Sequence, residues 1–110
     1  MPVTVMFSTF PSADKAAEIA RVLVDERLAA CVNLIPGARS IYRWHGEVCD
    51  EVETIAIIKT TAERVADLTA RLVSLHPYEL PEAVATTISG GHVPYLSWVA
   101  EQVASTTQQP

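Results

Sequence analysis

Hydrophobic and polar residues alternate from Val3 to Phe7, and this period of two predicts a first β-strand that ends before Pro11. Ser12 follows as a candidate N-cap, because its hydroxyl can accept a hydrogen bond from the first turn of a helix. Apolar residues then recur at helical spacing to about Leu28. The chain is therefore expected to open with a strand and an amphipathic helix.

Residues 30–60 are expected to form one long arm of two strands. Apolar and β-branched residues dominate this segment, which is interrupted at Pro36-Gly37 and at His45-Gly46. The first interruption predicts a bend or bulge inside one strand, and the second predicts a hairpin turn. The returning strand is apolar on both faces, which is typical of a central strand. The expected strand segments are 30–35, 39–44 and 48–60.

The second half of the chain carries the signals of a helix, a strand and a final helix. Thr60 and Glu63 match a capping box, which places an N-cap at Thr60. This helix is expected to end by His76, because a proline follows it. Residues 83–89 form the fourth predicted strand, and Pro94 suits the first turn of the last helix.

The order β-α-β-β-α-β predicts an α+β fold, a ferredoxin-like sandwich with one sheet and two helices on one of its faces. The extra C-terminal helix and the long bent hairpin are additions to this core. Residues 1–110 are expected to form a single domain, with a frayed polar tail over about 105–110.

Composition and charge exclude several classes of function. The net charge of −5 argues against a nucleic-acid partner, because such binding depends on Lys and Arg that neutralise phosphates. The amino terminus lacks the positive region of a secretory signal, and no apolar run is long enough to span a bilayer. Two cysteines, Cys31 and Cys49, are too few for a disulfide framework. A cytoplasmic protein with reduced thiols and no membrane partner is expected.

Four segments of the chain stand out as motifs: "ERLAACVNLIPGARSIYRWHGEV", "IIKTT", "HPYELPE" and "PYLSWV". In this order and spacing they resemble the CutA family of divalent-cation tolerance proteins. The resemblance extends from Val3 to about Val103. It implies a homotrimer in which the hairpin reaches beyond its own subunit, so that neighbouring subunits cover the exposed strand edge. Tyr42 and Trp44, at alternate positions on the arm, would then be trimer anchors.

His76 is the candidate metal ligand, since imidazole is a common ligand for copper. The alternative is a helix-terminal histidine that satisfies backbone carbonyls. The family's proposed copper site uses a cysteine in the first strand and two histidines before Pro-Tyr. Here those positions hold Ser8, Leu75 and His76, so the resemblance implies weak copper binding and no required cofactor. His45, Glu47 and Cys49 also alternate, but a hairpin tip at Gly46 would break their alignment.

Lys59 follows an apolar strand and precedes a helix, so a carboxylate such as Glu82 or a bound anion is expected beside it. A ligand cleft is predicted if the trimer brings the motifs together; the alternative is that the same groups hold the interface. Its residues are Lys59, Thr60, Tyr78, Glu82, Tyr95 and Trp98.

No triad or activated nucleophile accompanies Cys31, so the protein is not expected to be an enzyme. Two classes of function stay open. One is a trimeric protein that responds to divalent metal ions. The other is a small-ligand or anion sensor like the PII signalling proteins, or a trimeric scaffold without metal chemistry.

Overall fold

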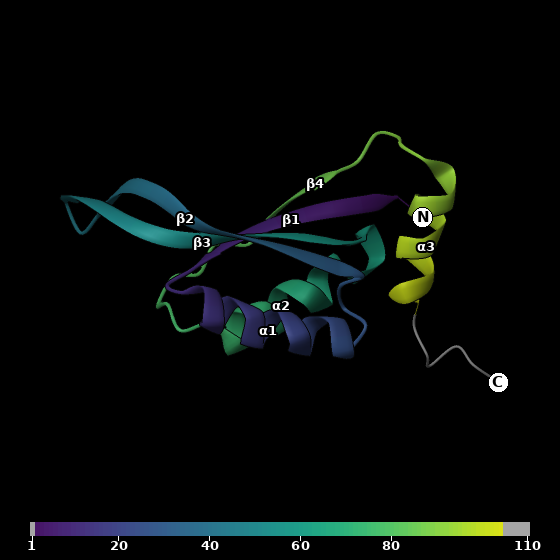
Figure 1. The fold of residues 1–110 in the computed structure, drawn as a ribbon, viewed down its shortest axis with the longest axis horizontal. Helices are drawn as coiled ribbons and strands as arrows, with labels where there is room; N and C mark the ends of the chain where they lie inside the picture. The colour runs from purple at the N-terminus through teal and green to yellow at the C-terminus, as the bar shows by residue number, and fades with distance from the viewer. Residues whose placement is uncertain (1, 105–110) are drawn as a thin grey trace.

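The computed structural model describes residues 2–104, and its elements follow the predicted order (Figure 1). The four strands form one antiparallel sheet in the order β2-β3-β1-β4, with β3 inside, which confirms the ferredoxin-like fold and the central strand. The expected tail at 105–110 lies outside the described residues. The elements are β1 (Val3–Phe10), α1 (Ala13–Asp25), β2 (Cys31–Trp44), β3 (Glu47–Thr61), the short 3₁₀ helix η1 (Ala62–Arg64), α2 (Val65–Leu75), β4 (Val84–Thr87) and α3 (Val93–Gln102).

Helix α1 begins as predicted but ends early. The Ser12 hydroxyl accepts a hydrogen bond from the Lys15 N–H, which confirms the N-cap. The predicted end near Leu28 is wrong, because Arg27 adopts a left-handed backbone conformation with φ of 60°. The N–H of Leu28 then bonds to the carbonyl of Leu23, in the pattern of a Schellman motif. The left-handed position after a helix is usually occupied by glycine, so Arg27 provided no recognisable stop signal.

The arm contains both predicted interruptions. The pairing register skips between Ile35 and Ala38, and Gly37 there has φ of +80°, so the first break is a bulge within β2. His45 and Gly46 both have positive φ and form a two-residue hairpin turn. The arm lengthens the molecule to 52 Å along its longest axis, against 27 and 23 Å along the others (Figure 1).

The predicted capping box does not form. Thr60 and Thr61 stay within β3, and the chain enters α2 through η1, without a side-chain cap. The Thr60 hydroxyl instead donates to the carbonyl of Leu28 at 2.8 Å, so a tertiary hydrogen bond replaces the local one. Helix α2 ends before His76 as predicted. Strand β4 is shorter than expected, with four residues. Within residues 2–104, no helix has the length and apolarity needed to cross a bilayer.

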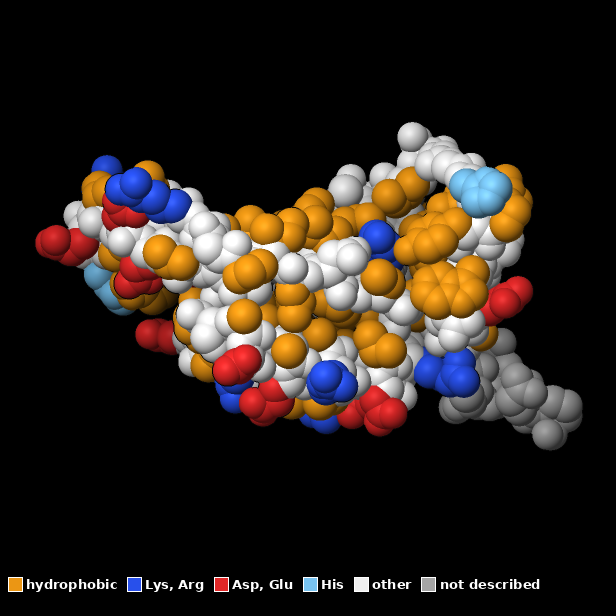
Figure 2. Space-filling model, in the orientation of Figure 1, with side chains coloured by type: hydrophobic (Ala, Val, Ile, Leu, Met, Phe, Trp, Pro, Cys, Tyr) orange, Lys and Arg blue, Asp and Glu red, His pale blue; other side chains and the backbone are white. Residues whose placement is uncertain are grey.

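The two faces of the sheet are covered unequally. Helices α1 and α2 lie together on one face, while the opposite face, here called the open face, carries no helix over its middle (Figure 1). Figure 2 shows hydrophobic side chains gathered over this part of the sheet and towards α3. The core under α1 and α2 includes Met6, Phe10, Ile19, Leu23, Ile58, Leu68 and Leu72, and a smaller cluster beside α3 contains Val3, Ala30, Val99 and Val103.

One pair of threonines within this sheet offers a matched test of buried hydroxyl energetics. Thr4 and Thr60 are direct cross-strand partners, and both are buried. The Thr4 hydroxyl has no hydrogen-bond partner among the described residues, whereas that of Thr60 donates to Leu28. We expect Thr4→Val to stabilise the fold by about 1 kcal/mol and Thr60→Val to destabilise it by a similar amount. Chemical denaturation of both variants measures this difference, and the same sign for both would contradict it.

Candidate functional site

His76 is fixed by two backbone hydrogen bonds. Its Nδ1 lies 3.1 Å from the Tyr78 nitrogen and accepts that N–H, so the ring proton sits on Nε2 and donates to the Thr9 carbonyl at 2.7 Å. The ring is only 8% exposed and stacks on Phe10 at 4.5 Å between ring centroids. Nε2 therefore ties the 76–78 segment to the end of β1, while Nδ1 fixes the backbone within that segment.

This arrangement constrains the predicted metal role of His76. A metal would have to displace the Tyr78 N–H from Nδ1 or the Nε2 proton from the Thr9 carbonyl. Among the described residues there is no group of three His, Cys, Asp or Glu side chains that could hold a metal ion. Ser8, at the first-strand position, is buried, and its hydroxyl has no hydrogen-bond partner within residues 2–104. Metal binding by His76 stays a prediction, and the structure gives the residue a structural role as well.

The stability of the fold should fall in mild acid because of His76. Burial lowers the pKa of His76 below its usual value of 6.5, against smaller opposing effects from the Thr9 bond and the Glu53 charge. The unfolded chain therefore binds a proton near pH 6.5 that the folded chain does not bind. The stability that the neutral His76 contributes is present above pH 6.5. It is lost as pH falls below that value, by at most about 1.4 kcal/mol per pH unit.

Denaturation curves recorded from pH 7.5 to 5 measure the slope of the free energy of unfolding against pH. His76→Phe should flatten it, and the exposed His92→Gln serves as the matched control for replacing a histidine. Equal slopes in wild type and His76→Phe would contradict the assignment.

A second group of site residues lines a cavity of about 670 Å³ between the arm and the segment that follows His76; we refer to it as the arm cavity. Tyr78 donates its hydroxyl to Glu53 at 2.6 Å, and Tyr42 donates to Glu51 at 2.6 Å. Burial, followed by the bond to Glu53, raises the pKa of Tyr78, and the bond to Glu51 raises that of Tyr42. Both phenols therefore stay protonated near neutral pH and act as hydrogen-bond donors.

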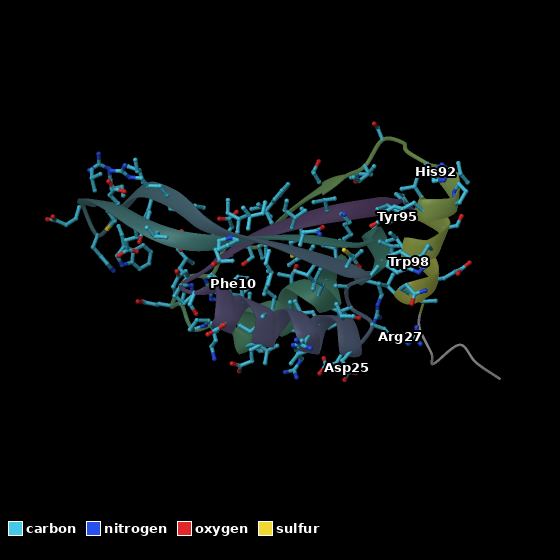
Figure 3. The ribbon with its side chains drawn as sticks, viewed as in Figure 1. Phe10, Asp25, Arg27, His92, Tyr95 and Trp98 are labelled. Atoms are coloured by element: carbon cyan, nitrogen blue, oxygen red, sulfur yellow. The ribbon has the colours of Figure 1, made fainter. Side chains whose placement is uncertain are left out.

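Lys59 lies away from the arm cavity, beside α3. Its Nζ is 3.5 Å from the Tyr95 hydroxyl and 5.6 Å from the centre of the Tyr95 ring, and Tyr95 packs against Trp98. Figure 3 shows Tyr95 and Trp98 on the side of α3 that faces the sheet. Lys59 is half-buried and forms no salt bridge with any described residue, Glu82 included. A bound anion as its partner stays a prediction.

Within one subunit, the residues of the predicted cleft separate into three places. Lys59, Tyr95 and Trp98 form one cluster beside α3. Tyr78 and Glu82 line the arm cavity, together with both predicted anchors, Tyr42 and Trp44. Thr60 is buried on the helix-covered face and contacts Leu28. A single cleft would need contributions from more than one subunit, as the sequence-based prediction assumed.

Sequence reasoning missed two residues of the arm cavity, Glu51 and Glu53. Both point to the same side of β3, because side chains two apart share a face of a strand. The available signal was their alternation just before the apolar run that starts at Ile55. An acidic residue next to such a run, here the 93%-buried Glu53, indicates a specific partner.

Comparison with known proteins places this geometry in a family. Residues 4–102 match the family described as CutA1 divalent ion tolerance protein. The divalent-cation tolerance protein CutA of Thermus thermophilus is 48% identical over 97 residues, which cover 88% of this chain and 94% of that protein. The chain belongs to the CutA1 family. The CutA protein of Homo sapiens is 45% identical over 103 residues, but these cover only 58% of its length.

Solved CutA1 structures share the whole fold described above. The CutA structure from Xylella fastidiosa is 48% identical and superposes with a TM-score of 0.89 over 92% of this chain and 97% of that one. The CutA1 structure from Oryza sativa, at 35% identity, gives a TM-score of 0.92 over 96% and 97%. The bent arm and α3 are therefore features of the CutA1 fold, and the resemblance seen in the sequence motifs is confirmed.

Proposed function

We propose that this CutA1 chain acts as a homotrimer in the response to divalent metal ions and carries no catalytic role. Divalent-ion tolerance is named in the family description and in the name of the Thermus thermophilus relative. The observation that supports assembly is the open face. In a lone subunit, this face leaves large apolar side chains in water, and contiguous exposed apolar surface marks an interaction site.

The open face combines residues from all four strands. Phe7 pairs directly with Ile57 on β3 and with Val84 on β4, and Ile35 pairs with Ile55, so these side chains share a face. Phe7, Ile35 and Val84 are 36%, 47% and 55% exposed. Burial of apolar surface contributes about 25 cal/mol per Å², so covering this face with neighbouring subunits stabilises an assembly.

The arm supports a closed ring rather than a simple pair. It extends β2, an edge strand, well past the helices, and an uncovered edge of this length pairs readily with another chain. Tyr42 and Trp44 lie on one side of the arm and are 39% and 36% exposed, as aromatic anchors for a neighbour would be. Cyclic symmetry with three copies gives each arm a neighbour and leaves no edge open.

Copper binding by the trimer is proposed to be weak. His76 has both nitrogens engaged, and Ser8 and Leu75 stand where the proposed family site has further ligands. We expect calorimetry with Cu(II) to give a dissociation constant no tighter than about 1 μM, because a single imidazole cannot fix a coordination geometry. Nanomolar binding that disappears in His76→Gln would overturn this expectation.

A cytoplasmic location is part of the same proposal. Its support is that Cys31 and Cys49 are both free thiols, which is typical of a reducing compartment. Cell fractionation with an antibody to the chain tests this point separately from assembly.

A further inference from the structure

The arm cavity has a surplus of negative charge. Four carboxylates line it, against the single guanidinium of Arg43. Two of them, Glu51 and Glu53, accept short hydrogen bonds of 2.6 Å from tyrosines, a length typical of an O–H group donating to an ionised carboxylate. The tyrosines are neutral donors, so they leave the charge in place. The field inside this cavity therefore favours a cation.

Glu53 offers the most direct contact point for a cation. It is 7% exposed, and its Oε2 accepts the Tyr78 hydroxyl, while no described residue donates to Oε1. None of the salt bridges among residues 2–104 involves Glu53. Oε1 is not one of the fully buried atoms that lack a hydrogen-bond partner, so it can be reached from the cavity that Glu53 lines. A charged donor bound there would form the strong kind of hydrogen bond.

The walls of the cavity define the kind of cation. The described residues provide no cluster of ligands that could hold a bare metal ion. The aromatic rings of Tyr42, Trp44 and Tyr78 line the same space as the carboxylates. Such a lining suits a charged nitrogen group attached to an apolar stem, because the stem contacts the rings and the nitrogen reaches an oxygen.

We propose that the arm cavity is a binding site for an organic cation, an alkyl ammonium or guanidinium group that bonds to Glu53 Oε1 and lies against Tyr42, Trp44 and Tyr78. The site is separate from Lys59, which lies beside α3. It has the opposite charge preference to an anion cleft, and it does not depend on metal binding. The same chemistry is carried by a free amine and by a lysine or arginine side chain of a second copy of this chain.

Calorimetry and thermal unfolding of the full chain at low salt test the site with 1,4-diaminobutane as the probe. Butane-1,4-diol has the same stem without charge, and magnesium chloride has charge without a stem. We expect the diamine to bind and to raise the melting temperature, because a ligand selective for the folded state stabilises it. The diol and magnesium should produce no comparable shift.

Variants locate the binding. Glu53→Gln keeps the shape of the side chain and should weaken diamine binding about tenfold or more, the loss of one charged hydrogen bond. Glu51→Gln, on the exposed side of the cavity, should weaken it less while leaving the fold intact. Glu63→Gln is the matched control, an exposed glutamate on η1 outside the cavity, and should bind as wild type does.

The remaining outcomes separate the two sources of the cation. If the diamine does not bind wild type but Glu53→Gln weakens self-association about tenfold relative to Glu63→Gln, a side chain of a second copy occupies the cavity, and the proposal stands. If the diamine does not bind and Glu53→Gln associates as wild type does, the proposal is wrong. Equal diamine affinity in wild type, Glu53→Gln and Glu51→Gln, or an equal response to the diol, would also overturn it.

Discussion

Phe7→Asp should convert the proposed trimer into folded single chains. Phe7 lies in the middle of the open face, paired with Ile57 and Val84. Its side chain is 36% exposed in one subunit, so an aspartate is solvated there when the chain is alone. In the assembly, the same carboxylate would be buried without a partner in each of three copies, at a cost of several kcal/mol per charge. The loss of assembly should therefore be complete at micromolar concentration.

Circular dichroism and particle mass, measured together, distinguish dissociation from unfolding. Val73→Asp is the matched control, because Val73 is 45% exposed on α2, on the helix-covered side of the sheet. Val73→Asp should give the same particle mass as wild type. A Phe7→Asp protein that assembles as wild type does would show that the open face is not an interface.

His76→Ala should reduce the free energy of unfolding by about 3 kcal/mol. The change removes a ring that stacks on Phe10 and leaves a buried carbonyl at Thr9 and an N–H at Tyr78 without their partners. Each unsatisfied buried group costs about 1–3 kcal/mol, and the lost packing adds to this. Chemical denaturation with extrapolation to water measures the loss.

His76→Phe separates the two causes, since a phenyl ring keeps the stacking on Phe10 and loses both hydrogen bonds. We expect the free energy of unfolding of His76→Phe to lie between those of wild type and His76→Ala. A loss below about 1 kcal/mol in His76→Ala would mean that the segment after α2 is held by other contacts, and the structural role of this histidine would be wrong.

Local signals in the sequence were sufficient for most of the fold. The bulge at Gly37 and the turn at Gly46 were predicted because glycine permits the positive φ that each needs. The end of α1 was missed because Arg27 adopts a left-handed conformation that its residue type rarely shows. The capping box failed because Thr60 has a better partner 32 residues away, at Leu28. Such long-range hydrogen bonds leave no local pattern.

The candidate sites were harder to predict, because they depend on which side chains the topology brings together. The sequence indicated that α2 ends before His76, but the hydrogen bond of His76 to Thr9 depends on the position of β1. The pairing of Tyr78 with Glu53 joins residues 25 apart, and only the folded chain brings them together. An apolar pattern on both faces of β3 predicted burial on both sides. The pattern did not indicate that, on the open face, no helix of the same subunit covers the middle of the sheet.

The mass of the wild-type particle tests the proposed assembly most directly. Sedimentation equilibrium of the full chain, over a range of concentrations around 1 μM, should give three times the 11.9 kDa mass of one chain. The mass should stay constant across that range, because apolar faces and paired arms buried in a closed ring do not dissociate readily. A particle of 11.9 kDa at these concentrations would show that the open face and the arm are stable in water, and would contradict the proposed assembly.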